Sequence, residues 1–131
     1  LTRSGEYDLG LEPRVQMANR ANATIFVSIH ANAISMSRPD VNGLETYYYD
    51  SGKALADTVH QTMLQDIDSL RDRRVRQARF YVLRRSSMPS ILIETGFVTG
   101  AEDAARLSNP QYRSQMAASI ARGILRYLGR G

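Results

Sequence analysis

The chain has 131 residues, 43% of them hydrophobic, which is enough for one folded core without disulfide or metal cross-links. It has no cysteine, so disulfides, thiolate zinc sites and cysteine nucleophiles are excluded. Its apolar runs all fall well short of the ~20 residues needed to cross a bilayer. Its net charge of +4 reflects 17 basic residues, all arginine except one lysine.

The first third of the chain predicts a helix followed by a buried strand. Residues 14–22 have the composition of a short helix, and Pro13 suits its first turn. Residues 24–29 are mostly apolar, which is typical of a strand buried on both faces. A loop is predicted at residues 35–43, where Ser, Pro, Asn and Gly gather.

The middle of the chain predicts a second strand and an amphipathic helix. Residues 44–50 alternate between two kinds of side chain, as in a strand with two different faces. Apolar side chains then recur every four residues, which predicts a helix that begins near Ser51 and buries one stripe. That stripe consists of Leu55, Val59, Met63 and Ile67. His60 lies one step off the stripe, and we expect it at the surface or its boundary.

An arginine-rich segment follows, with seven arginines between Arg71 and Arg85. One interpretation is a solvated loop and strand face. The alternative is an anionic partner: nucleic acid, an acidic polymer, or substrate carboxylates held by guanidinium groups. Within this segment, residues 80–85 alternate and predict a further strand after the arginine-rich loop.

The C-terminal part predicts a second buried strand and a long helix. Residues 90–96 are uniformly apolar up to a single acidic residue. Asn109 can cap the helix, Pro110 fits its first position, and Gly129 is expected to end it. One face of this helix is lined by Tyr112, Met116, Ile120 and Ile124.

Together these elements predict an α/β fold: a twisted, mostly parallel (mixed) sheet with helices on both faces, in one domain over residues 1–131. Each of the two apolar strands ends in a polar residue, His30 in the first and Glu94 in the second. Ligands of open α/β sheets bind at the carboxyl ends of the strands. If the two strands are parallel near-neighbours, both side chains lie at the same edge.

The chemistry of these two residues is complementary. A neutral imidazole at His30 suits a zinc ligand. Glu94 follows three aliphatic residues, so it must be paired, linked to a metal or raised in pKa, and it then suits a general base for hydrolysis. The structural alternatives are a hydrogen-bonded core histidine at His30 and a Glu94 that pairs with Arg84 or Arg85.

Several motifs occur in one order along the chain. They are LTR (1–3), RVQMANRANA (14–23), SIHAN (28–32), GLETYYYD (43–50), FYVLR (80–84) and PSILIETGF (89–97). In this order they resemble the zinc-dependent N-acetylmuramoyl-L-alanine amidases of bacterial cell-wall turnover and cell division. The run of motifs is much more specific than any one of them.

The resemblance implies a mixed sheet that holds one zinc through His, Glu and His. In that family the zinc activates a water that cuts the amide between the lactyl group of N-acetylmuramic acid and L-Ala of the stem peptide. The His of SIHAN, a zinc ligand in the family, corresponds to His30. The Glu of the ETGF motif, the general base, corresponds to Glu94.

The family's two other zinc ligands precede the position that matches Leu1. We therefore expect that this chain lacks the N-terminal strand and helix segment of the domain, that sequence continues upstream, and that the residues present bind zinc poorly by themselves. Glu6 and Glu12 fall after that point in the family order and are not assigned as ligands. The alternative function is a non-catalytic peptidoglycan-binding fragment of the same fold.

The resemblance also implies partners and a compartment. The expected partners are peptidoglycan and the stem peptide of muramyl peptides, with a protein activator as a further candidate, in the periplasm or cell wall. Asn32 is expected to orient the site, while Arg84 and Arg85 are expected to hold stem-peptide carboxylates because their predicted strand leads toward it. Nucleic-acid binding is disfavoured, because neither a basic recognition helix nor an aromatic RNA platform is evident.

Overall fold

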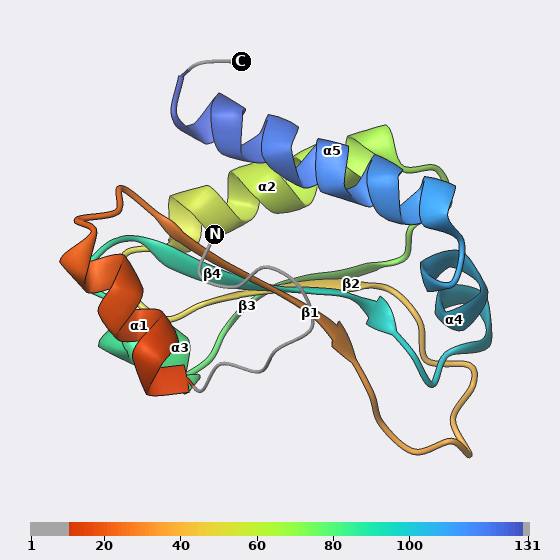
Figure 1. The fold of residues 1–131 in the computed structure, drawn as a ribbon. Helices are drawn as coiled ribbons and strands as arrows, with labels where there is room; N and C mark the ends of the chain where they lie inside the picture. Colours follow the sequence, from red (N-terminus) through yellow and green to blue (C-terminus); the bar gives the residue numbers. More distant parts are fainter. Residues whose placement is uncertain (1–10, 130–131) are drawn as a thin grey trace.

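A computed structural model describes residues 11–129, except for the side chain of Leu11; the LTR motif and Glu6 lie outside the described residues. Its four strands form one mixed sheet in the order β1-β4-β2-β3 (Figure 1). β1 is parallel to β4 and β2 is parallel to β3, whereas β2 and β4 are antiparallel. The strands are β1 (Phe26–Asn32), β2 (Leu44–Tyr48), β3 (Asp72–Gln77) and β4 (Ser90–Phe97).

Helices cover both faces of this sheet, which confirms the predicted fold class. α2 and α5 lie on one face, while α1 and α3 lie on the other (Figure 1). The helices are α1 (Leu11–Arg20), α2 (Lys53–Asp66), α3 (Tyr81–Arg85), α4 (Ala101–Leu107) and α5 (Pro110–Tyr127). None of the described helices combines the length and apolar character needed to cross a membrane.

Each face of the sheet has its own apolar core. β4 contributes to both: Ile91 and Ile93 pack toward α2 and α5, and Leu92 packs toward α1 and α3. This double burial is the reason that its sequence is apolar without alternation. The predicted stripe of α2 is fully buried in the first core, together with Met116 and Ile120 of α5.

The long C-terminal helix forms as the sequence predicts. The Asn109 side-chain oxygen accepts a hydrogen bond from the Gln111 backbone N–H at 2.9 Å, with proline next to the cap. Gly123 lets this helix approach α2 closely, because a Cβ there would lie only 2.8 Å from Cα of Val59. Gly129 adopts a left-handed φ of 73° just after the helix ends.

Two parts of the arginine-rich segment differ from the prediction. Residues 72–77 form strand β3 instead of a loop; β3 has a single described neighbour, β2, and an edge strand tolerates exposed charged side chains. Residues 81–85 form helix α3 instead of a strand. Val82 and Leu83 are adjacent in sequence and both buried in the core under α1, an arrangement that an alternating strand does not produce.

His60 is buried, so the expectation of a surface position was wrong. The residue is 1% exposed on α2. Its Nδ1 lies 2.8 Å from Oγ1 of Thr46, and its Nε2 lies 2.8 Å from Oδ1 of Asp72. Both ring nitrogens therefore have polar partners, and the side chain joins α2 to β2 and to the first residue of β3.

Helix α4 was not predicted, and its buried Asp103 links several elements. The carboxylate Oδ2 accepts hydrogen bonds from the backbone N–H groups of Gly43 and Phe97, each at 2.8 Å. The backbone N–H of Asp103 donates to Oδ1 of Asn42 at 3.0 Å. One carboxylate thus connects α4 with the residue before β2 and with the last residue of β4.

Replacing Asp103 with Ala should lower the free energy of unfolding by about 3 kcal/mol, because two buried N–H groups lose a charged acceptor. Urea denaturation monitored by circular dichroism measures this change. Glu102→Ala is the matched control: its exposed pair with Arg71 should contribute less than ~1 kcal/mol. Equal effects of the two variants would contradict the assignment of Asp103 as a buried link.

Candidate functional site

The parallel pairing of β1 and β4 brings His30 and Glu94 together. The two residues are direct register partners, although more than sixty residues separate them in the sequence. This pairing confirms the prediction that the two apolar strands are parallel neighbours. The ladder becomes irregular immediately afterwards, between His30 and Asn32.

These polar side chains share the sheet face on which α1 and α3 pack. Phe26 and Leu92 lie in the core beneath those helices. Side chains two residues further along a strand point to the same face, which places Ser28, His30 and Glu94 on it. The face is therefore apolar at the beginning of the two strands and polar toward their carboxyl ends.

Glu94 has the electrostatic character of a base. Its Oε2 is buried and has no hydrogen-bond partner in the described structure. Burial, and then the nearby carboxylate of Glu45, raise the pKa of Glu94 to about 7. The ion pair with Arg84 or Arg85 that would have made it structural is absent from the described residues.

His30 is held at one ring nitrogen. Its Nε2 lies 2.7 Å from Oγ of Ser28. Burial, and then the positive charge of Arg14, lower the pKa of His30, which favours the neutral imidazole. In the tautomer in which Nε2 donates to Ser28, Nδ1 keeps a lone pair for a further partner.

Glu45 on β2 is the part of the site that sequence reasoning missed. It is 3% exposed and is the antiparallel register partner of Glu94. Its Oε1 accepts from the Tyr47 hydroxyl at 3.0 Å and from the Asn32 amide at 3.3 Å. The alternation of residues 44–50 predicts its face, but nothing in the local pattern indicates that it is buried beside Glu94.

The arginines that reach this group come from β3. Arg73 Nε donates to Oε2 of Glu45 at 3.1 Å, and Arg76 Nε lies 3.7 Å from the same oxygen. Arg84 and Arg85 lie on helix α3, where both guanidinium groups are 6.0 Å from the Tyr81 ring. The strand that was expected to lead them toward the site does not exist.

The residues present fit one part of a zinc site. A neutral His30 with one ring nitrogen held by Ser28 has the arrangement of a metal-binding histidine. Residues 11–129 contain no group of three His, Cys, Asp or Glu side chains that could hold a metal ion. His30 therefore supplies a single candidate ligand, and a complete set of ligands is not formed within the described chain.

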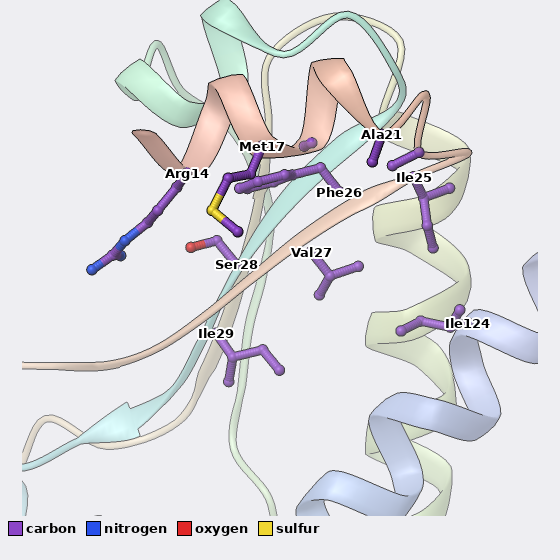
Figure 2. Close-up of a pocket in the computed structure, with 11 residues that line it drawn as sticks. Arg14, Met17, Ala21, Ile25, Phe26, Val27, Ser28, Ile29 and Ile124 are labelled. Carbon is purple, nitrogen blue, oxygen red and sulfur yellow. The ribbon is translucent and has the colours of Figure 1, made fainter. Parts of the chain in front are cut away.

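A hollow of about 730 Å³ runs beside the outer edge of β1, between α1 and α5 (Figure 2). Its lining is mostly apolar, with Arg14 and Ser28 as polar members, and it includes neither His30 nor Glu94. A second hollow of about 440 Å³, which His30 and Thr95 help to line, opens toward α5. The larger hollow is thus next to the polar group and is not its centre.

Comparison with known proteins gives consistent matches to cell-wall amidases. The N-acetylmuramoyl-L-alanine amidase LytC of Bacillus subtilis (strain 168) is 41% identical over 132 residues, which cover 97% of this chain but 26% of LytC. The solved structure of the N-acetylmuramoyl-L-alanine amidase AmiC2 of Nostoc punctiforme is 60% identical with a TM-score of 0.96, covering 98% of this chain and 71% of AmiC2.

A further solved structure is the catalytic domain of CwlV, an N-acetylmuramoyl-L-alanine amidase from Bacillus (Paenibacillus) polymyxa var. colistinus. It is 37% identical to this chain with a TM-score of 0.90, and the match covers 99% of this chain and 72% of the CwlV chain. The chain thus spans about a quarter of LytC. The sequence model of the family described as N-acetylmuramoyl-L-alanine amidase matches residues 1–126. The order of motifs, the fold and this match together place the chain in the N-acetylmuramoyl-L-alanine amidase family.

Proposed function

We propose that this protein hydrolyses the amide bond between N-acetylmuramic acid and L-Ala of the peptidoglycan stem peptide. The observation that carries the proposal is the register pairing of His30 with Glu94, which places a neutral imidazole beside a carboxyl group of raised pKa. LytC and AmiC2 are amidases by name, and family membership supports the same substrate class for this chain.

In this proposal His30 is one ligand of a zinc ion whose other ligands lie outside the described residues. A zinc ion bound there would supply a Lewis acid that makes a water molecule easier to deprotonate. Glu94 takes the proton of the attacking water and delivers it to the leaving amine of L-Ala. Its position on a strand buried on both faces keeps the carboxylate at a fixed place relative to His30.

Substrate contacts and location are part of the same proposal. Asn32 orients the site through its contact with Glu45, and Arg84 and Arg85 stay candidates for carboxylate binding from α3. The protein acts outside the cytoplasm, in the periplasm or cell wall, in cell-wall turnover and cell division. A protein activator remains a candidate partner.

A peptidoglycan-binding fragment without catalysis is the second candidate. It is favoured by one observation: residues 11–129 provide no complete group of metal ligands. The two candidates differ in zinc content and turnover, and variants of His30 and Glu94 separate them.

Glu94→Gln keeps the shape of the side chain but removes its basicity. In the full protein this variant should retain zinc and peptide binding while kcat for a soluble muramoyl peptide falls at least ~10²-fold. Turnover per folded molecule, zinc content and melting temperature are measured together. Glu102→Gln, the same change at an exposed carboxyl, should leave kcat unchanged. Near-normal turnover of Glu94→Gln would end the assignment as base.

His30→Ala should lower the zinc content of the full protein, measured by elemental analysis, because one ligand is lost. His60→Gln is the matched control, since it removes the other imidazole while leaving hydrogen-bonding groups for Thr46 and Asp72. Zinc that stays stoichiometric in His30→Ala would show that His30 is not a ligand.

Glu94 should also make stability depend on pH in the metal-free protein. Its folded-state pKa of about 7 lies above the ordinary 4.5, so its contribution is full below about pH 4.5 and is lost as pH rises to about 7. Glu94→Gln should therefore be more stable than the parent protein at pH 8, by about 1–2 kcal/mol after solvent screening, and similar to it at pH 4.5. Chemical denaturation with chelator present at both pH values measures this difference. A variant less stable at pH 8 would instead indicate a structural partner for Glu94.

A further inference from the structure

Two arginines of β3 are fixed in place by a single buried carboxylate. Glu45 is 3% exposed, and both Arg73 and Arg76 direct Nε toward its Oε2, at 3.1 and 3.7 Å. Arg76 Nε also donates to the backbone carbonyl of Arg73 at 2.9 Å. These contacts hold two long, flexible side chains in defined positions before any ligand arrives.

The same arginines keep binding capacity for a ligand. Their side chains are 34% and 47% exposed, and no hydrogen bond from their terminal guanidinium nitrogens is found among the described residues. The Arg73 guanidinium carbon lies 5.2 Å from the centroid of the Phe97 ring, so the ring packs against the guanidinium group in a cation–π contact. Both groups therefore present N–H donors to solvent while Nε is occupied.

In the cluster of Glu45, Arg73 and Arg76, the positive charges outnumber the negative charge. Two guanidinium groups face one carboxylate, which leaves a net charge of about +1 on this part of the surface. Asn32 and Tyr47 use the other oxygen of Glu45 and bring no charge, because the pKa of Tyr47 is raised to about 12, chiefly by burial. A second carboxylate, supplied by a ligand, would complete the pairing.

The position of the cluster relative to the reacting bond follows from the sheet order. Glu94 lies on β4, Glu45 on the neighbouring β2, and the arginines on β3 beyond it. The guanidinium groups of both arginines reach back to Glu45 on β2, which is one strand spacing, roughly 5 Å, from Glu94. An extended peptide advances about 3.3–3.6 Å per residue, so this distance corresponds to about one or two residues beyond the bond cleaved at Glu94.

We propose that Arg73 and Arg76 form a carboxylate-binding subsite that recognises an acidic residue one or two positions along the stem peptide from its L-Ala. The inference rests on the proposed amidase function, which places L-Ala at Glu94. It assigns carboxylate recognition to β3, whereas the sequence had directed attention to Arg84 and Arg85. Glu45 acts here as a positioning residue for the two guanidinium groups.

Binding of a free stem peptide tests the subsite without requiring turnover. The probe is a synthetic stem tripeptide with free carboxylates, compared by calorimetry with the same peptide in which every carboxylate is a carboxamide. The full protein should bind the carboxylate form at least about tenfold more tightly, with an advantage that shrinks in high salt. Absence of binding, or equal binding of both peptides, overturns the proposal.

Two variants locate the subsite. Arg76→Ala removes the more exposed arginine, and Arg73→Lys keeps the charge beside Glu45 while removing the planar fork, so that folding is preserved. Each should bring the binding ratio of the two peptides close to one. Arg71→Ala is the control from the same segment, since its guanidinium is already paired with Glu102. A tenfold preference that survives in both variants, or that is lost in Arg84→Ala instead, overturns the assignment.

Hydrolysis of a muramoyl peptide by the same preparations separates the two proposals. Hydrolysis combined with equal binding of both probe peptides removes the subsite and leaves the amidase function standing. Carboxylate-dependent binding that the Arg76 and Arg73 variants abolish, without hydrolysis, supports the subsite and contradicts the catalytic proposal.

Discussion

The parallel pairing of β1 with β4 is the contact on which the rest of the structure depends. It aligns His30 with Glu94, and it extends the surface that α1 and α3 cover on one side and α5 contacts on the other. Because β4 is buried on both faces, its register against β1 is fixed, and this fixes the relative positions of His30 and Glu94. A slip by one residue would send Glu94 to the opposite face.

A buried carboxylate organises the neighbouring half of the site. Placing Glu45 in the interior costs free energy unless several donors approach it, and here a hydroxyl, an amide and two guanidinium groups do so. The resulting cluster has two effects. It fixes β3 against β2 through side chains as well as through the backbone. It also keeps the Glu45 carboxylate itself beside Glu94, where its negative charge contributes to the raised pKa of Glu94.

The sequence indicated those features that depend on local pattern. Strands β1 and β4 and helices α2 and α5 follow from apolar spacing and caps, and His30 and Glu94 stand out because they interrupt or end apolar runs. β3 could not be found this way, since a charged segment becomes a strand only when β2 offers its edge. The burial of His60 likewise depends on residues from two other elements.

The secondary structure that carries Arg84 and Arg85 was predicted wrongly for the same kind of reason. Alternation at residues 80–85 is compatible with a strand, but packing against α1 selects one helical turn that buries Val82 and Leu83 together. The role of Glu45 could not be predicted from its local sequence, because it depends on contacts between β2, β3 and β4. Local sequence therefore located His30 and Glu94 more reliably than the groups that surround them.

The long separation of His30 and Glu94 in the sequence has a consequence for how the domain acquires its chemistry. Bringing together two strands about sixty residues apart requires closure of a large loop, which costs roughly 4 kcal/mol in chain entropy before the pairing is formed. Contacts of this range form slowly compared with the local contacts of helices. During synthesis, a chain that has not yet produced β4 contains every other strand of the sheet but no juxtaposed imidazole and carboxyl group. The contact between His30 and Glu94 therefore forms only when this long-range pairing forms, and any opening that separates β1 from β4 breaks it.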